Sequence, residues 1–302
     1  MAKTRDPLVS VIIPTYKRKE KLIRCLKSVL ENGFKDLEVI VVNDNPQEDI
    51  SYITKMNKRI KLVQNKEQSL SARSRMEGAN VSNGKILYFI DDDNILEKGA
   101  IESLVGVVGS GKNVGIVTPL MYDVGGKIWY SGIRVHRPFI LQNTWSHGEN
   151  INKNKLIDTD IIINTYMIDR ELFFRVGGWE PENFTVLHED ANFSLKVKSL
   201  GYNNYVCPYA HTVHDTDHLT HITPTRIYYD SRNSTLLQYR YTTRIEFLLF
   251  LIFYLPRKFV YNVFYFIPFK AAHNKIAMYK GYLKGVIDGF LAMGRIKRVK
   301  LV

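Results

Sequence analysis

Cysteine is scarce in this sequence: only Cys25 and Cys207 occur among its 302 residues. The two lie far apart and match no spacing that is typical of a metal site or a redox motif. They are also too few for a framework of disulfide bonds. With 45% hydrophobic residues the chain can instead bury a large core, and we expect one full-sized domain with an appendage in a reducing environment.

Long hydrophobic runs are absent as well. The first apolar run, residues 8–13, is too short for the core of a signal peptide and ends at a proline. A later run, residues 245–255, covers eleven residues before Pro256, whereas a membrane-spanning helix needs about 20. We therefore expect a cytoplasmic protein without a signal peptide or a membrane-spanning helix.

The sequence has no G-x-G-x-x-G motif and no G-x-x-x-x-G-K-[ST] motif. Dinucleotide-binding proteins and P-loop enzymes hold phosphate groups with these loops, so both classes are excluded. No nucleic-acid-binding motif is present either, and we expect no nucleic acid as a partner. Other side chains or a metal ion must neutralise any phosphate that binds.

Short apolar runs alternate with amphipathic segments in the first 120 residues. Several of the runs are apolar throughout, as in strands whose sheet is covered by helices on both faces. The segments between them place apolar residues at helical spacing. This alternation predicts an α/β fold with a mostly parallel central sheet. The predicted strands are residues 8–13, 37–42, 60–63, 86–90 and 115–120.

Polar residues follow three of these strands at the end where ligands of parallel sheets bind. They are residues 14–16 (PTY), residues 43–45 (NDN) and residues 91–94 (DDDN). Three successive aspartates repel one another and raise one another's pKa unless a cation is present. Oxygen ligands favour Mg²⁺ or Mn²⁺, which complete their shells with water and substrate phosphates. The alternative is a solvated turn in which Asp93 or Asn94 caps a helix.

Six segments in fixed order resemble the motifs of glycosyltransferase family 2, in its galactofuranosyl- and rhamnosyltransferase-like branch. The resemblance covers roughly residues 8–235 and implies a GT-A fold. Its Q-x-x-R-W signature of processive members is missing, and residues 228–233 (YYDSRN) resemble the segment of non-processive enzymes instead. The six segments are residues 9–16 (VSVIIPTY), 41–44 (VVND), 71–75 (SARSR), 89–93 (FIDDD), 177–179 (GGW) and 188–195 (HEDANFSL).

The resemblance implies a donor site for a nucleotide sugar. A carboxylate at Asp44 would accept the imide N–H of uracil or thymine, which favours UDP or dTDP over GDP. Asp91 and Asp93 would be the acids of a D-x-D motif, with Asp93 as the direct metal ligand. An Asx turn is the alternative for Asp44. The implied donor residues are Pro14, Thr15, Tyr16, Asp44, Arg73, Asp91 and Asp92, and for Arg73 the alternative is a solvated helix face.

The same resemblance implies the catalytic and acceptor residues. Asp190 would be the base that takes the proton of the acceptor hydroxyl, although Glu189 and Asp190 also suit the start of a helix. Glu189 and Trp179 are expected near the acceptor, where packing is the alternative for Trp179.

A histidine about two dozen residues beyond the base completes the metal site in related enzymes. His214 matches this spacing better than His211, and a structural histidine is the alternative. His218 and His221 lie close enough in the sequence to compete for the assignment.

The last part of the chain is strongly basic. Residues 240–302 hold twelve lysines and arginines against two acidic residues, a net charge of +10 of the chain's +12. We predict a catalytic domain at 1–239 and a basic, aromatic-rich, amphipathic helical tail at 240–302 that lies on an anionic membrane surface. Packing of these helices on the catalytic domain, or on a second subunit in an oligomer, is the alternative.

The combined prediction is an inverting, metal-dependent transferase for a lipid-linked saccharide acceptor, peripherally bound at the cytoplasmic face of the cell membrane. Transfer to a polyprenyl phosphate is a second enzyme hypothesis. A non-catalytic protein that binds an anionic polymer is a third, which the intact Asp44, Asp93 and Asp190 disfavour. A sugar-nucleotide pyrophosphorylase would need a glycine-rich loop after the first strand, where the chain has residues 14–18 (PTYKR).

Overall fold

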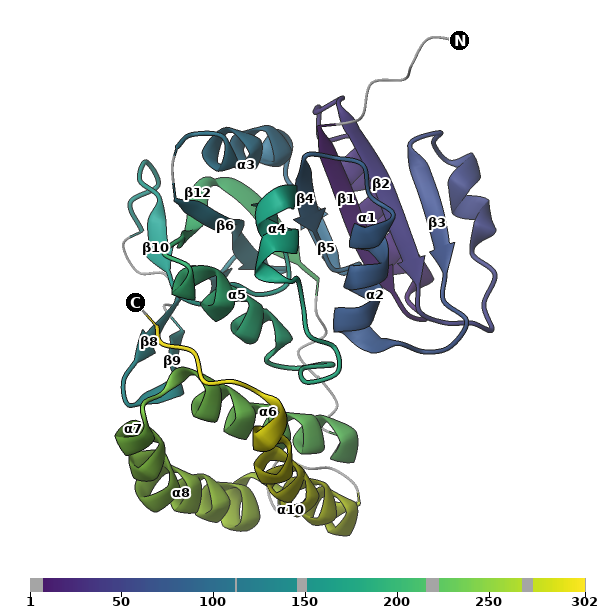
Figure 1. The fold of residues 1–302 in the computed structure, drawn as a ribbon. Helices are drawn as coiled ribbons and strands as arrows, with labels where there is room; N and C mark the ends of the chain where they lie inside the picture. The colour runs from purple at the N-terminus through teal and green to yellow at the C-terminus, as the bar shows by residue number, and fades with distance from the viewer. Residues whose placement is uncertain (1–7, 112, 146–150, 216–222, 268–273, 302) are drawn as a thin grey trace.

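A ten-stranded mixed sheet forms the centre of the computed structural model, which describes residues 8–111, 113–145, 151–215, 223–267 and 274–301 (Figure 1). The strand order is β10-β12-β6-β11-β4-β1-β2-β3, with β5 beside β12 and β7 beside β6, while β8 and β9 pair separately. The strands are β1 (Val9–Thr15), β2 (Leu37–Asn43), β3 (Ile60–Gln64), β4 (Ile86–Phe89), β5 (Asn94–Leu96), β6 (Val114–Asp123), β7 (Ile128–Tyr130), β8 (Ile133–His136), β9 (Phe139–Trp145), β10 (Ile157–Thr159), β11 (Tyr166–Asp169) and β12 (Asn203–His214).

The sheet has a parallel half that the sequence predicts correctly. Strands β3, β2, β1 and β4 run parallel, and β2 is buried along its whole length. Beyond them β6 and β12 also pair in parallel, but β11 lies antiparallel between β4 and β6. The predicted α/β fold with a mostly parallel central sheet is therefore confirmed.

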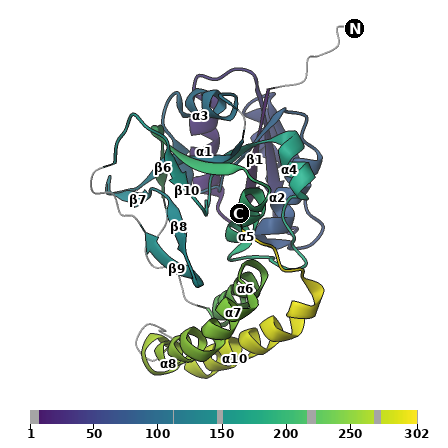
Figure 2. The same ribbon diagram turned by 60° about the vertical axis from the view of Figure 1, so that its left-hand side comes forward.

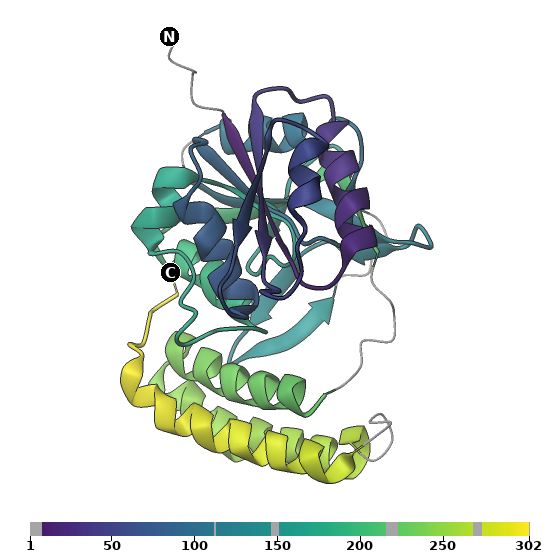
Figure 3. The same ribbon diagram turned by 90° about the vertical axis from the view of Figure 1, so that its right-hand side faces the viewer.

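Helices cover both faces of this sheet (Figure 1, Figure 3). One hydrophobic cluster joins α1 and α3 to odd-numbered positions of β1, such as Val11, and a second joins α2, α4 and α5 to the opposite face, through Ile12. Helix α1 fits its face because its apolar residues recur at helical spacing. These helices are α1 (Lys19–Leu30), α2 (Leu70–Asn80), α3 (Ala100–Val108), α4 (Arg170–Val176) and α5 (Glu189–Ser199), with a short turn η1 (Ser51–Lys55).

Helices α6 (Pro224–Tyr241) and α10 (Lys275–Ala292) lie side by side at one end of the molecule, as Figure 3 shows. Gly281, Gly285 and Gly289 of α10 face α6, and a Cβ atom on Gly285 would stand 2.4 Å from the carbonyl oxygen of Tyr228. Larger side chains on this stripe would force the helices apart. After the turn η4 (Met293–Arg295), Ile296 packs into a core cluster with residues of the sheet. Helix α10 thus packs against α6, and Ile296 against the sheet domain, while the boundary at 239/240 stays a prediction.

One helical segment runs from Arg244 to Tyr265 and is long and apolar enough to cross a membrane, judged by length and composition alone. It consists of α7 (Arg244–Leu249), the π-helical η2 (Phe250–Tyr254), α8 (Leu255–Val260) and the π-helical η3 (Tyr261–Phe266). The predicted break at Pro256 was wrong. Pro256 lies inside this continuous helical segment, two residues after the π-helical turn, whose wider backbone leaves room for the proline ring. Figure 2 shows this segment beside the β8–β9 hairpin, where Phe139 stacks on Tyr254.

Helix α2 approaches the sheet closely enough to give a stability test. A Cβ atom on Gly78 would stand 2.4 Å from Cγ2 of Ile12, whereas one on Gly106 of α3 would meet nothing within 4 Å. Gly78→Ala should lower the free energy of unfolding by about 1–3 kcal/mol through overpacking. Gly106→Ala should raise it by about 0.5–1 kcal/mol through helix propensity. Urea unfolding measures both, and an unchanged midpoint for Gly78→Ala would contradict the close packing.

Candidate active site

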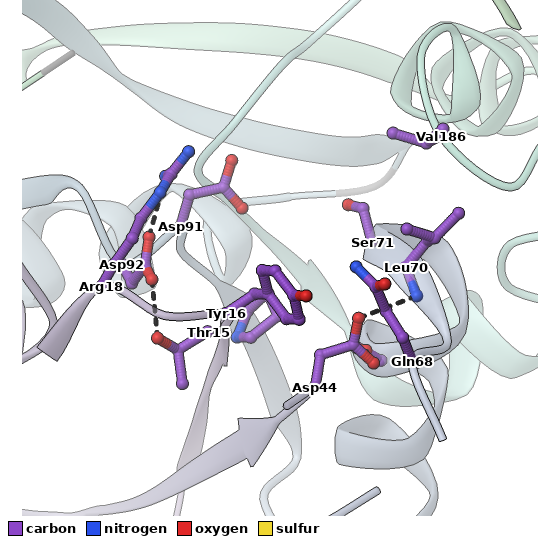
Figure 4. A pocket seen from close by; sticks show the side chains of 12 residues that line it. Thr15, Tyr16, Arg18, Asp44, Gln68, Leu70, Ser71, Asp91, Asp92 and Val186 are labelled. Carbon is purple, nitrogen blue, oxygen red and sulfur yellow. Dashed lines mark hydrogen bonds and ion pairs between the residues drawn. The ribbon is translucent and has the colours of Figure 1, made fainter. Parts of the chain in front are cut away.

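A cavity of about 330 Å³ opens at the carboxyl ends of β1, β2 and β4. Figure 4 shows Asp91 and Asp92 on one side, Asp44 with Gln68 and Leu70 on the other, and the ring of Tyr16 between them in this view. Six of the seven predicted donor residues line the cavity, and Arg73 does not. The six are Pro14, Thr15, Tyr16, Asp44, Asp91 and Asp92.

Asp44 is buried and held by the start of α2. Its Oδ1 accepts hydrogen bonds from the backbone N–H of Ser69 (2.7 Å), from Asn65 Nδ2 (2.9 Å) and from Ser74 Oγ (2.9 Å). Its Oδ2 accepts one bond, from the backbone N–H of Leu70 at 2.9 Å. Leu70 has φ +64°, a strained conformation that turns this N–H toward the carboxylate. Oδ2 retains a lone pair, so Asp44 can accept one more donor.

The position expected for Arg73 is corrected by the structure. Arg73 lies on the exposed side of α2, which fits the solvated alternative, and the arginine of α2 that reaches the site is Arg75, two residues later and 2% exposed. Buried positions of α2 include Ala72, Arg75 and Ala79. This helical spacing is the signal in the sequence that could have identified Arg75.

Arg75 joins three carboxylates beneath the cavity. Its Nη2 donates to Asp91 Oδ1 at 2.6 Å, and its Nη1 donates to Asp190 Oδ1 at 3.0 Å. Oε1 of Glu189 lies 3.6 Å from the same Nη1. Burial alone would lower the pKa of Arg75, but the charges of Asp190 and Asp91 raise it well above its ordinary value. The guanidinium therefore stays charged inside the protein.

The carboxylate of Asp190 is oriented from three sides. Besides Arg75, the hydroxyl of Tyr166 donates to Oδ1 at 2.9 Å, and the backbone N–H of Asn164 donates to Oδ2 at 3.2 Å. A carboxylate offers about four acceptor positions, so one position on Oδ2 is left. Next to it, burial and the charge of Asp190 raise the pKa of Glu189 to about 7. Glu189 is thus a buried carboxyl group that holds a proton up to neutral pH.

Asp92 and Asp93 share one cation, the guanidinium of Arg18. Arg18 Nη1 lies 3.1 Å from Asp92 Oδ1 and 2.9 Å from Asp93 Oδ2, and Thr15 Oγ1 donates to Asp92 at 2.7 Å. Burial raises the pKa of Asp92 to about 7 although Arg18 opposes the shift. Burial would raise the pKa of Asp93 too, but its hydrogen bond to His214 and the charges of His214 and Arg18 lower it.

His214 is the histidine that the structure brings to the aspartates. Its Nε2 lies 3.4 Å from Asp93 Oδ1, and its buried Nδ1 has no hydrogen-bond partner. His211 instead pairs with Glu97 at 2.9 Å. Two adjacent ligands of one octahedral ion stand about 3 Å apart, so Asp93 and His214 are suitably spaced. Among the described residues, no three His, Cys, Asp or Glu side chains gather as a metal site; His218 and His221 lie outside the described residues.

Trp179 belongs to the core rather than to an open surface. It is 2% exposed and packs edge-on against Phe89 with ring centroids 4.4 Å apart. Phe193 is also in contact, and the guanidinium of Arg75 lies 5.6 Å from the Trp179 ring. The packing alternative therefore describes this residue, and stacking on an acceptor sugar is corrected: the buried ring has no free face to offer. The Trp179 ring instead packs next to the guanidinium of Arg75.

Helix α6 holds the turn that leads into Glu189 and Asp190, a role that the sequence motifs did not reveal. Leu187 and His188 have φ values of +60° and +63°, which cost about 1–3 kcal/mol each in residues other than glycine. Asn233 Nδ2 donates to the carbonyl oxygens of Val186 and Leu187, both at 2.9 Å. The ring of His188 is hydrogen-bonded to Asp230 of the same helix. These contacts stabilise the strained turn.

Known proteins resemble the chain in both sequence and structure. Residues 10–174, a little over half of the chain, match the family described as Glycosyl transferase family 2. A GalNAc(5)-diNAcBac-PP-undecaprenol beta-1,3-glucosyltransferase of Campylobacter jejuni is 35% identical over 111 residues, which cover 35% of this chain and 36% of that enzyme. The chain spans between 14% and 36% of the length of three curated relatives that it matches.

Two solved structures share the fold at 16% identity each. GalNAc-T7 with UDP, GalNAc and Mn²⁺ superposes with a TM-score of 0.63 over 79% of this chain and 49% of that one. Residues 1–349 of TarS from S. aureus superpose with a TM-score of 0.59 over 93% of this chain and 80% of that one. With its matched family segment and its GT-A fold, the chain belongs to glycosyl transferase family 2.

Proposed function

We propose that this chain is an inverting, metal-dependent glycosyltransferase, and that it transfers a sugar from UDP or dTDP to a hydroxyl group of a lipid-linked saccharide. The observation that carries the proposal is that one cavity brings together Asp44, with an open acceptor position, and Asp91 and Asp92, while Asp93 shares the guanidinium of Arg18 with Asp92. Arg75 connects this cavity to Asp190. The residues proposed to bind the base, the diphosphate and the acceptor thus belong to one connected network.

Asp190 is the proposed catalytic base. An acceptor hydroxyl that attacks the anomeric carbon must lose a proton, and a positioned carboxylate contributes about 10² to 10⁴ in rate. The hydrogen bonds from Arg75, Tyr166 and Asn164 orient Asp190 and leave a lone pair on Oδ2. Direct attack on the side opposite to the leaving diphosphate inverts the anomeric configuration.

Asp93 and His214 would hold Mg²⁺ or Mn²⁺, and substrate phosphates would complete its shell. A bound divalent cation supplies positive charge for the leaving nucleoside diphosphate. The solved structure of GalNAc-T7 contains UDP and Mn²⁺, which supports such an ion in a protein of the same fold. The low pKa of Asp93 keeps this ligand ionised.

The C-terminal helices are the proposed contact with the membrane. Between Arg244 and Tyr265, 11% of the most apolar window is buried, so most of it faces away from the protein. Helix α10, which also belongs to the predicted tail at 240–302, adds an exposed apolar stripe. The net charge of +10 in residues 240–302 suits anionic headgroups, so we propose that the segment lies in the headgroup layer. The exposed side chains include Ile245, Leu248, Ile252, Phe253, Val260, Phe264, Leu283, Ile287 and Leu291.

The acceptor class follows from this surface and from the relatives. The Campylobacter jejuni relative is described as acting on a PP-undecaprenol-linked glycan. An enzyme held at the cytoplasmic face of the cell membrane would meet such acceptors there. Below about pH 7 Glu189 carries a proton that it can donate to an acceptor oxygen beside Asp190.

Asp190→Asn tests the catalytic proposal. The change removes proton acceptance but keeps size and most hydrogen bonds, so turnover should fall at least about a hundredfold while donor affinity stays nearly the same. Turnover is measured with UDP- and dTDP-sugars, and NMR of the product should show inversion at the anomeric carbon. Turnover near that of the wild type, or retention of configuration, would overturn the mechanism.

Glu189→Gln tests the electrostatics of the base. The pKa of Glu189 is raised from its ordinary value of 4.5 to about 7 in the folded protein. The protonated Glu189 therefore stabilises the folded state fully below pH 4.5, and this stabilisation is lost as the pH rises through 7. The glutamine variant cannot ionise at this position. Its free energy of unfolding minus that of the wild type should therefore increase by about 1–3 kcal/mol from pH 5 to pH 8. Urea unfolding at each pH measures the gap. The exposed Glu77→Gln is the control, and a gap that does not vary with pH contradicts the buried carboxyl group.

Flotation with vesicles of phosphatidylethanolamine and phosphatidylglycerol tests the membrane contact. The full-length protein should float at low salt, and added salt should weaken binding without abolishing it. Leu248→Glu combined with Phe264→Glu, at side chains 54% and 66% exposed, should reduce flotation strongly. Val124→Glu, 61% exposed in the β6–β7 turn, is the matched control. A wild-type protein that stays unbound at low salt would remove the membrane proposal.

A further inference from the structure

We propose that Arg18 is a ligand of the donor's diphosphate, and that it exchanges Asp92 and Asp93 for phosphate oxygens when the metal ion and the donor enter. The assignment deepens the proposed function and rests on it. Arg18 would then bind the two aspartates in the free protein and phosphate oxygens once the donor is bound. As a result, the metal ion and the diphosphate would each strengthen the binding of the other.

Arg18 lies at the position where the diphosphate of the donor would bind. It lies between β1 and the first residue of α1, at the carboxyl edge of the sheet, and its side chain lines the cavity. The preceding residue, Lys17, has φ +56°, so a tight turn directs the chain here. Figure 4 shows the guanidinium of Arg18 above Asp92, beside Asp91.

The charge balance of the cavity calls for a cation that can reach a phosphate. Among the described residues that line it, three are carboxylates, at Asp44, Asp91 and Asp92, and Arg18 is the only cation. The other arginine of the site, Arg75, is 2% exposed and is occupied by its carboxylate partners. The chain has no phosphate-binding glycine loop, so Arg18 is the side chain available for this task.

Arg18 has donors to spare. A guanidinium carries five N–H donors, and both hydrogen bonds to the aspartates use Nη1 alone. Within the part of the chain that the structure describes, Nε and Nη2 of Arg18 make no hydrogen bond. The side chain is 52% exposed, so it can turn without crossing a packed core. Arginine matches phosphate oxygens in pairs, which favours the exchange.

Arg18 and the proposed metal ion also compete for one carboxylate. Arg18 Nη1 lies 2.9 Å from Asp93 Oδ2, while His214 Nε2 lies 3.4 Å from Asp93 Oδ1. A divalent cation placed beside Asp93 would repel a guanidinium at that distance. Without a diphosphate, Arg18 therefore lowers the affinity of the site for the metal ion. When a diphosphate is bound, Arg18 pairs with the phosphate oxygens instead and no longer competes with the metal ion.

Arg18→Ala should change two affinities in opposite directions. Mn²⁺ alone, followed by the loss of its free EPR signal, should bind at least about threefold more tightly because a competing cation is gone. The second affinity is measured at a saturating concentration of Mn²⁺, for inorganic pyrophosphate and for whichever of UDP and dTDP binds the wild type. Both ligands should bind Arg18→Ala at least about tenfold more weakly because a charge-assisted contact is lost. Isothermal titration measures the second effect.

Two other variants serve as controls. Arg134 is a matched arginine, also 52% exposed and paired with two aspartates, Asp158 and Asp160, away from the cavity. Arg134→Ala should leave both affinities unchanged. Asp93→Ala should abolish Mn²⁺ binding, which shows that the EPR signal reports the proposed site.

The outcomes separate this assignment from the proposed function. Opposite changes in Arg18→Ala support the exchange. Equal losses of Mn²⁺ and nucleotide binding would mean that Arg18 only positions the aspartates, and an unchanged nucleotide affinity would mean that it does not touch the diphosphate; both overturn the assignment alone. A wild-type protein that binds neither Mn²⁺ nor a pyrimidine nucleotide would overturn the proposed function, and the assignment with it.

Discussion

The buried guanidinium of Arg75 is the interaction on which the site depends. It carries charge at a position that is 2% exposed, and it is stable there because the carboxylates of Asp91 and Asp190 contact it. A buried charge of this kind is costly without such partners. The same contacts tie two distant parts of the chain together: Asp91 follows a strand of the parallel half, and Asp190 begins a helix almost a hundred residues later. The carboxyl end of β4 and the start of α5 are therefore held by one guanidinium.

Most of the fold could be predicted from the sequence because it depends on local patterns. Apolar runs and helical spacing are short-range signals, and they located strands β1 to β4, β6 and helix α1 correctly, while β12 was not predicted. The antiparallel β11 was not predicted, because strand direction is decided by partners far away in the sequence. The helix through Pro256 was missed for a different reason: a π turn before the proline relieves the clash that normally ends a helix.

The site was predicted less completely, and Arg73 and Arg75 show why. A motif names residues but not the face of the helix on which they lie, and a shift of two positions turns a side chain from the core to the solvent. Arg18 was missed because its partners follow a different strand. The turn before Glu189 depends on Asn233, whose hydrogen bonds to Val186 and Leu187 cross more than forty residues of sequence. Such contacts are properties of the assembled structure.

The glycine stripe on α10 has a mechanical consequence. Where Gly281, Gly285 and Gly289 meet α6, they lie against its backbone and against the short side chains of Ser231 and Thr235, with no room for a larger side chain. Helix α6 also carries Asn233, which is hydrogen-bonded to the turn in front of Glu189 and Asp190. A side chain larger than glycine on this stripe would push α6 away from α10, and the shift would reach that turn through Asn233. The packing of α10 therefore bears on a turn that lies on the other side of α6.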